Sequence, residues 1–290
     1  MMSIIGGLAR ASHPAPSVAV TALGLTIGSA TGLALPTLTV LGSALLLGQV
    51  SVGWSNDWID AKRDRVVARL SKPVAVGTVS VAVVRAAAFV AVALALIVTA
   101  FLGWLCVVAH ACALVSAWLY NAGLKKTVAS WVPFAVSFGL LPAIASLAFS
   151  PPKWPTAWIV AAAACLGIAA HFANVLPDLA DDKNTGVRGL PHRVGATRSG
   201  IAAFGLLGVA SVAVMLGFFL APAVEGEFIE AHVIGTIVIV GLTVTAGIFA
   251  CGVTLVVRKQ FGRNLFHLII AGAFADAAMI ALAGMCLITS

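Results

Sequence analysis

The sequence predicts an all-α, polytopic membrane protein with about nine transmembrane helices in one bundle and a cytoplasmic cap. Three observations support this fold class. Of the 290 residues, 61% are hydrophobic and only 9% are charged, and the mean hydropathy is +1.09. Apolar runs of about 20 residues, enough for a helix to cross the hydrocarbon core, recur along the chain. The charged residues fall mainly between these runs. A chain of this composition has too little polar surface to cover a water-soluble domain, so residues 1–290 form a single membrane domain.

Nine apolar runs account for the predicted spans, in chain order. Each is followed by a connection that carries charged or turn-forming residues, and short connections leave neighbouring spans antiparallel. The spans cover residues 17–35, 36–52, 79–100, 102–119, 130–149, 154–173, 201–221, 233–257 and 265–288.

The charges of the connections predict the orientation. The formal net charge is +7. A nucleic-acid partner could explain it, but the basic residues fall in alternate connections, near Arg10, residues 62–72, 125–126, 183–198 and 258–263. The opposite connections hold Lys153 and the acidic residues of 225–230. Basic loops stay in the cytoplasm, which predicts a multi-pass cell-membrane protein with its N-terminus inside and its C-terminus outside, and no nucleic-acid partner.

Two short acidic clusters, each at the cytoplasmic end of a predicted span, contain six of the ten acidic residues. Both have the spacing N-x-x-x-D-x-x-x-D. At about 100° per residue, each cluster occupies one helix face. The two spans lie an even number of crossings apart, so both faces meet at one membrane surface. The first acidic cluster is Asn56, Asp57, Asp60 and Asp64, and the second is Asn174, Asp178, Asp181 and Asp182.

Stacked carboxylates repel one another near hydrocarbon, and a divalent cation would remove that conflict. Oxygen ligands without His or Cys favour Mg²⁺, which binds a few carboxylates together with substrate phosphates. The eight residues of both clusters are therefore predicted metal ligands, with two Mg²⁺ ions and a phosphate as co-ligand. The alternative is that they are solvated carboxylates paired with nearby Lys and Arg.

Basic residues follow each cluster. They are predicted to bind the phosphate oxygens that the metal ions do not reach, in a substrate that carries a diphosphate. Arg offers paired donors to phosphate oxygens, and Lys acts as a point charge. For any one of them, the competing interpretation is an ordinary basic residue that keeps its loop on the cytoplasmic side of the membrane. The predicted substrate-binding residues on this side are Arg69, Lys72, Tyr120, Lys125, Lys126, Arg188 and Arg193. Pro177 removes a backbone donor in the second cluster and is predicted to kink its helix.

Asp276 lies about ten residues inside the last predicted span, where an ionised carboxylate is costly. It is predicted to contact the substrate in one of two ways. It could touch the molecule that accepts a transferred group, or it could take up the proton that this molecule releases after the transfer. A protonated or hydrogen-bonded packing residue is the alternative.

On these motifs the sequence resembles the UbiA superfamily of intramembrane prenyltransferases. The motif N-D-x-x-D-x-x-x-D is complete in the first acidic cluster, and D-x-x-x-D appears as Asp178 and Asp182. Segments 120–126, 130–134 and 186–195 also look like those of the family. One departure is His13-Pro14, where many relatives have Arg-Pro near the first span.

The resemblance implies a nine-helix bundle with a central cavity that opens to lipid, capped by the motif loops. Its catalytic residues would be Asp60, Asp64, Asp178 and Asp182. Asn56, Asp60, Asp178 and Asp182 would bind Mg²⁺, supported by Asp57, Asp64 and Asp181. Arg69, Lys72, Tyr120 and Lys126 would position the diphosphate.

The predicted function is Mg²⁺-dependent transfer of a prenyl group from a prenyl diphosphate to a small acceptor, most simply an aromatic quinone precursor. That acceptor follows from the resemblance alone. A terpene synthase or a prenyl-phosphoribose-forming relative of the same family is the alternative. A cation-coupled transporter fits less well, because the acids cluster at one face and only Asp276 lies deep.

Overall fold

The computed structural model describes residues 4–67, 69, 72–179, 182, 186–220, 231–283 and 288, and over these residues it contains helices and no strand. The all-α prediction is confirmed. The α-helices are α1 (Ile4–Ala11), α2 (Pro14–Ala30), α3 (Leu35–Val66), α4 (Val81–Ala100), α5 (Trp104–Ala122), α6 (Val132–Gly139), α7 (Leu141–Ser146), α8 (Ala157–Val175), α10 (Leu190–Val194), α11 (Ala196–Leu220), α12 (Ala231–Val257) and α13 (Arg263–Ala283). Two 3₁₀ turns are η1 (Leu124–Lys126) and η2 (Leu176–Asp178).

Seven helices of the described chain are long and apolar enough to cross a membrane, namely α3, α4, α5, α8, α11, α12 and α13. Two shorter apolar segments, Pro14–Ala30 and Val132–Ser146, lie where the first and fifth spans were predicted. The nine predicted runs therefore all fall on helices. Length and composition support a full crossing for seven of them.

Two predicted boundaries were wrong. The second span was expected to end at residue 52, but α3 continues as one helix of 32 residues through the first acidic cluster to Val66. Cationic side chains placed against its carboxylates remove the repulsion that would otherwise end the helix. The fifth span is divided into α6 and α7 at Leu140, and Pro142 lies in the first turn of α7. Proline is tolerated at a helix start but not inside a helix, which accounts for the break.

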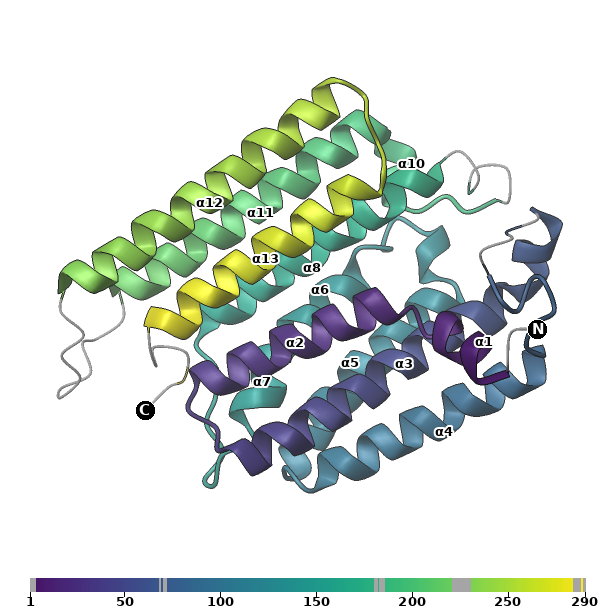
Figure 1. The fold of residues 1–290 in the computed structure, drawn as a ribbon, viewed down its shortest axis with the longest axis horizontal. Coiled ribbons are helices and arrows are strands. Elements are labelled where there is room, and N and C mark those ends of the chain that lie inside the picture. Colours follow the sequence, from purple (N-terminus) through teal and green to yellow (C-terminus); the bar gives the residue numbers. More distant parts are fainter. Residues whose placement is uncertain are drawn as a thin grey trace.

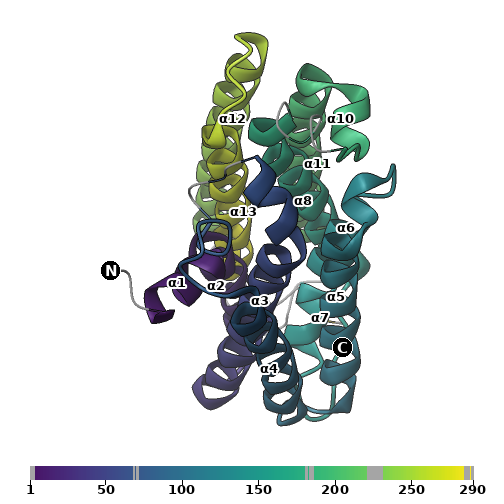
Figure 2. The ribbon, with the colours of Figure 1, turned by 90° about the vertical axis from the view of Figure 1, so that its right-hand side faces the viewer.

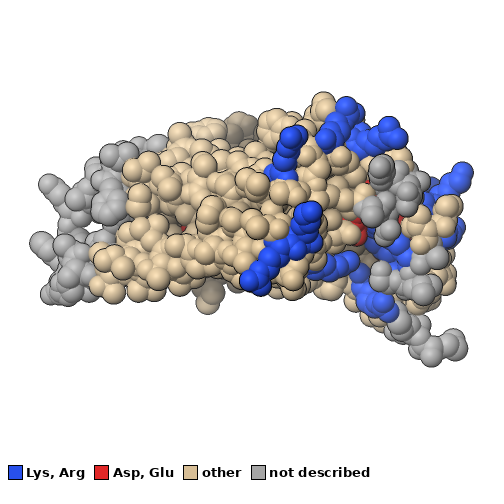
Figure 3. Space-filling view, turned by 90° about the horizontal axis from the view of Figure 1, so that it is seen from above, with Lys and Arg blue, Asp and Glu red and all other residues tan. Residues whose placement is uncertain are grey.

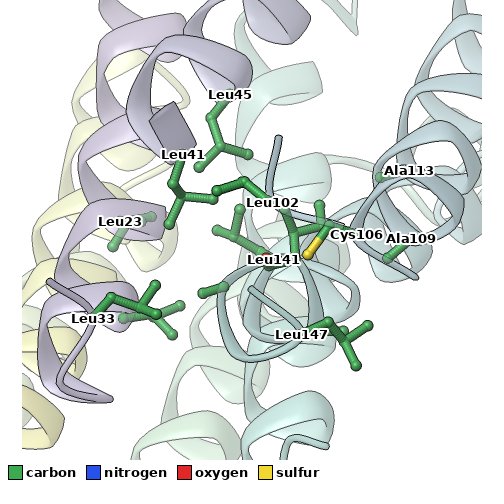
Figure 4. Close-up of a cluster of buried hydrophobic side chains, with 14 of the residues drawn as sticks. Leu23, Leu33, Leu41, Leu45, Leu102, Cys106, Ala109, Ala113, Leu141 and Leu147 are labelled. Atoms are coloured by element: carbon green, nitrogen blue, oxygen red, sulfur yellow. Dashed lines mark hydrogen bonds between the residues drawn. The ribbon is translucent and has the colours of Figure 1, made fainter. Parts of the chain in front are cut away.

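The helices form an elongated bundle with two halves (Figure 1). Helices α2, α3, α4, α5 and α7 make one half, and α8, α11, α12 and α13 make the other. Figure 2 shows the same two groups from the side. Helix α13 contacts α2 as well as α8 and α11, so it joins the halves. Within the first half, Leu41, Cys106, Leu141 and Ile144 are nearly fully buried in an apolar cluster (Figure 4).

Lys and Arg side chains gather at one end of the bundle, with a long surface free of blue or red side chains beside them (Figure 3). The connections that follow α3, α5, α8 and α12 carry most of these cations. We call this the basic end. Helix α1 lies at this end and the C-terminal end of α13 lies at the other (Figure 1). The basic connections predicted to share one side of the membrane therefore lie at one end of the bundle.

Candidate active site

The first acidic cluster occupies the last turns of α3, at the basic end. Because the helix is continuous there, its predicted face forms, and Asn56 Nδ2 donates to Asp60 Oδ2 at 3.3 Å. Asp57, Asp60 and Asp64 are only 1%, 6% and 1% exposed. Buried carboxylates need counter-charges, and each of the three has at least one.

Lys125 is the counter-charge of Asp60. The η1 turn directs Lys125 inward, where its Nζ atom lies 2.6 and 2.7 Å from the two carboxylate oxygens. Burial lowers the pKa of Lys125 and the Asp60 charge opposes that shift. The next residue, Lys126, is exposed. Arg63 Nη2 completes the surroundings of Asp60 at 3.1 Å.

Asp57 is held by Lys72 and His13. The Lys72 ammonium bonds Asp57 Oδ1 and donates to Asn56 Oδ1 at 2.9 Å. His13 Nε2 lies 2.9 Å from Asp57 Oδ1 and 3.2 Å from Lys72 Nζ. His13 joins α1 to α2 with a φ of 53°, in the left-handed region. The chain thus turns sharply to bring an N-terminal side chain onto α3.

Gly53 lets this connection approach α3. A Cβ atom at residue 53 would lie 2.3 Å from the carbonyl oxygen of Ser12. At the next residue, Trp54 Nε1 donates to Leu8 O at 2.8 Å. The segment before α2 is therefore fixed on α3 beside Asp57.

The second acidic cluster differs from its prediction. Helix α8 ends at Val175, and η2 carries the chain through Pro177 to Asp178, so the residues do not share one α-helical face. Pro177 causes this change, because it cannot donate to the helix. Asn174 is exposed, Asp178 is partly exposed and Asp182 is buried. Asp181 lies outside the described residues.

Arg69 joins the two clusters. Its Nε atom lies 3.8 Å from Asp64, and its Nη2 atom lies 3.6 Å from both Asp178 and Asp182. Arg63 makes a second link through Nη1, 3.6 Å from Asp182. The expectation that the two clusters meet at one surface is borne out by these contacts.

Other predicted substrate residues lie nearby without the same contacts. Arg188 and Arg193 are exposed, and Arg193 Nε donates to the carbonyl of Arg188 at 3.2 Å. Tyr120 lies edge-on to Phe134 and His171, with ring centroids 5.1 and 5.7 Å apart.

Four residues at the site were not among the predicted ligands. Arg63 and His13 contact the first cluster, and His192 Nε2 lies 3.3 Å from Asp182 Oδ2. Asn121 accepts from Asn56 at 3.2 Å and donates to Ser55 Oγ at 2.7 Å. Arg63 could have been found from its place within the first motif. The histidines have no local spacing that marks them.

The donor set fits a hard cation that binds with additional ligands. Asp57 Oδ2 and Asp64 Oδ2 are buried without a hydrogen-bond partner, which leaves two carboxylate oxygens available. Among the described residues, no three Asp, Glu, His or Cys side chains lie close enough to hold a metal by themselves. Mg²⁺ commonly takes one or two carboxylates and completes its shell with water and phosphate, so this arrangement suits it.

Asp276 is remote from both clusters. It is 1% exposed, and its Oδ2 atom lies 3.0 Å from Ser211 Oγ, while Oδ1 has no hydrogen-bond partner. No contact joins it to the acidic clusters among those the structure describes. Its predicted role in substrate binding stays a prediction.

A family model described as the UbiA prenyltransferase family matches residues 17–260. A UbiA homolog from Archaeoglobus fulgidus bound to GPP and Mg²⁺ is similar in structure, with 19% identity, a TM-score of 0.68, and coverage of 93% of this chain and 99% of that one. A UbiA homolog from Aeropyrum pernix K1 has 17% identity, a TM-score of 0.67 and coverage of 97% and 98%. A digeranylgeranylglyceryl phosphate synthase structure has 13% identity, a TM-score of 0.63 and coverage of 98% and 99%. A search of curated proteins gives no match.

Proposed function

The chain belongs to the UbiA prenyltransferase family, and from that premise we propose that it transfers a prenyl group from a prenyl diphosphate to a small acceptor, with Mg²⁺. The observation that carries this proposal is the bridge made by Arg69. It brings the carboxylates of both acidic clusters together around a guanidinium group, which is a good donor to phosphate oxygens.

Mg²⁺ would be held by oxygens of the two clusters. Asp57 Oδ2 and Asp64 Oδ2 have no hydrogen-bond partner, and Lys72 Nζ lies 3.8 Å from Asp64 Oδ2, which favours both oxygens as ligands. The remaining proposed ligands are Asn56, Asp60, Asn174, Asp178, Asp181 and Asp182. When bound, the ions would stabilise the negative charge that develops on the departing diphosphate.

The cations at the site would bind the phosphate oxygens. Arg63 and Arg69 present planar pairs of donors, and Lys72 and Lys125 present point charges. All four already contact carboxylates of α3, so their side chains point to the place where diphosphate would lie. The exposed Lys126, Arg188 and Arg193 would attract the anion from solution.

The surroundings would protect the allylic cation that forms when the diphosphate departs. Tyr120 and Phe134 offer aromatic faces, which attract a cation, and contribute no strong nucleophile. The burial of Asp57, Asp60 and Asp64 excludes bulk water, which would otherwise capture the cation. An electron-rich acceptor would then attack this cation, and the proton that the acceptor loses would pass to the departing diphosphate. We propose an aromatic ring, as in a quinone precursor.

The proposed orientation places the basic end in the cytoplasm. The concentration of Lys and Arg at this end supports that placement through the positive-inside rule. The N-terminus and the active-site loops would then lie inside and the C-terminus outside. A soluble diphosphate would reach the acidic clusters from the cytoplasm.

The test is a matrix of prenyl diphosphates and candidate acceptors, with purified protein in lipid nanodiscs and mass detection of products. Diphosphate release that needs Mg²⁺, together with a prenylated acceptor, is the expected result. Cyclised products that form without an acceptor would indicate that the protein is a terpene synthase and not a transferase. The absence of any Mg²⁺-dependent diphosphate release across the matrix would refute the proposal.

Two matched variants complete the test. Asp60→Asn and Asp178→Asn keep side-chain size and remove a charge from each cluster, and both should abolish diphosphate release. Lys153→Gln, in the connection between α7 and α8 at the opposite end of the bundle, is the control and should turn over normally. Thermal unfolding of each variant separates lost chemistry from lost fold.

A further inference from the structure

Two cations lie on the outer surface of the bundle, near the basic end. Lys62 is on α3 and Arg85 is on α4, and both side chains are exposed. Among the residues that the structure describes, neither side chain has a hydrogen-bond or ion-pair partner. Arg85 lies four residues after Val81, the first residue of α4, so it is about 6 Å inside an apolar helix that is long enough to span a membrane. The bundle therefore carries a charge where lipid would surround it.

Lys62 lies on the opposite face of α3 from the acidic cluster. At about 100° per residue, Asp60 and Asp64 are each about 160° from Lys62 around the helix. Trp58 is only about 40° from Lys62, and its ring contacts a side chain of α4. The face of α3 that carries Lys62 is thus separate from the face that forms the candidate active site.

Ring contacts place Arg85 beside Lys62. Helices α3 and α4 are antiparallel neighbours (Figure 1), and the ring centroids of Trp58 and Phe89 are 6.4 Å apart. One helical turn closer to the basic end, the residue on the same face is Lys62 on α3 and Arg85 on α4. The two cations therefore lie at the same level on neighbouring helices.

Aromatic side chains extend from the two cations toward the middle of the bundle. Phe89 is 53% exposed, and its ring centroid is also 5.2 Å from that of Trp118 on α5. Trp118 Nε1 donates to Ser51 Oγ at 3.4 Å, which holds the indole against α3. Val115, three residues before Trp118, is exposed as well. The surface that α3, α4 and α5 form here has a charged end, and the rest of it is aromatic and apolar.

Lys62 and Arg85 need an anion from outside the protein. Two like charges side by side repel each other, and no carboxylate that the structure describes contacts either one. Near the end of a membrane span, Arg and Lys extend their charged groups toward the lipid headgroups. Phosphate oxygens match the paired donors of Arg85 and the point charge of Lys62. An anionic phospholipid supplies both the phosphate and the hydrocarbon that would cover the aromatic rings.

We propose that Lys62 and Arg85 bind the headgroup of an anionic phospholipid, with an acyl chain along Phe89 and Trp118. A zwitterionic headgroup fits the two cations less well, because it carries a positive charge that they repel. The site requires only that lipid surrounds the bundle. It does not depend on prenyl transfer or on the side of the membrane at which the basic end lies.

The test measures lipid binding to the purified protein in detergent by native mass spectrometry. Phosphatidylglycerol is titrated into the sample, and phosphatidylcholine with the same acyl chains is the neutral comparison. Wild type should bind the first phosphatidylglycerol molecule about fivefold to 30-fold more tightly than phosphatidylcholine, since each cation near the membrane surface typically contributes about fivefold. Equal affinities for the two lipids in wild type would overturn the proposal.

Charge variants assign the preference to these two residues. Lys62→Gln and Arg85→Gln should each weaken phosphatidylglycerol binding about fivefold, and the double variant should weaken it about 25-fold. Lys62→Arg combined with Arg85→Lys keeps both charges and should bind like wild type. The control combines Arg258→Gln with Lys259→Gln, which removes the same charge from exposed residues after α12, on the far side of the bundle from α4 (Figure 1). Equal losses in the two neutralised double variants would show a response to net charge alone and would contradict the assignment.

Brominated phosphatidylglycerol locates the acyl chain, because bromine quenches the fluorescence of an indole that it contacts. Trp118→Phe should remove part of the quenched intensity at one lipid per protein. Trp154→Phe, at the opposite end of the bundle, should leave that intensity unchanged. An unchanged quenched intensity in Trp118→Phe would place the lipid elsewhere and contradict the site. If inorganic diphosphate binds as tightly as phosphatidylglycerol, the two cations serve a soluble anion, and the lipid proposal is wrong.

Discussion

The ammonium of Lys125 lies 2.6 and 2.7 Å from the two oxygens of Asp60, although the residues are far apart in sequence and both are buried. The contact connects the loop after α5 to the acidic face of α3. Removing one partner of a buried ion pair leaves the other charge without compensation, which is much more costly than breaking a surface pair.

Lys125→Met should therefore reduce both stability and diphosphate release. We expect a loss of about 3 kcal/mol in unfolding free energy, the lower end for a broken buried pair, because Arg63 Nη2 still lies 3.1 Å from Asp60. Thermal unfolding and a diphosphate assay measure the two effects. Lys126→Met is the control, because Lys126 is exposed, and it should unfold like wild type. Similar losses in both variants would contradict the distinct role of Lys125.

Arg69→Gln should weaken prenyl diphosphate binding. Arg69 contacts carboxylates of both clusters, and a lost charge-assisted contact corresponds to a rise in KM of about 10-fold to 100-fold. Steady-state kinetics with a fixed acceptor measure this change. Arg65→Gln is the neighbouring control, since its Nη2 atom contacts only the Val74 carbonyl, at 3.5 Å, among the contacts described. If Arg69→Gln has the KM of the wild-type protein, the contacts of Arg69 with the two clusters do not contribute to binding of the prenyl diphosphate.

His13→Ala should raise the KM for the prenyl diphosphate about 10-fold, the lower end for the loss of one hydrogen bond to a charged group. The imidazole lies against Asp57 and Lys72, so its loss releases both side chains from their positions. His13→Arg restores the Arg-Pro pattern of the relatives and should recover most of the affinity. If Arg at this position is no better than Ala, the interaction with Asp57 is not what His13 contributes.

Gly53→Ala should destabilise the packing of the N-terminal segment on α3. The new Cβ would meet the Ser12 carbonyl oxygen, and strain of this kind costs about 1–3 kcal/mol. Thermal unfolding gives the size of the loss. Gly205→Ala in α11 meets no atom within 4 Å and should not destabilise the fold. Equal unfolding temperatures for the two variants would show that the segment adapts freely.

The sequence predicted the helices and the meeting of the acidic clusters, because hydropathy and the spacing of Asn56, Asp60 and Asp64 are local patterns. Whether Lys125 or Lys126 faces inward was not predictable, since that depends on a 3₁₀ turn of three residues. His13 and His192 reach the acids only through tertiary packing. The end of α8 at Val175 follows from Pro177, whose effect was expected as a kink rather than a change of helix type.

The backbones that carry the two acidic clusters differ in stiffness. Helix α3 passes through its cluster without interruption, so moving Asp60 means tilting or bending a helix of 32 residues. The regular hydrogen bonding of α8 ends before Asp178, and a small change in the backbone dihedral angles there is enough to shift it. The carboxylates of α3 should therefore keep their positions when a substrate binds. The carboxylates that follow α8 should be the ones that shift to fit phosphate groups in different positions.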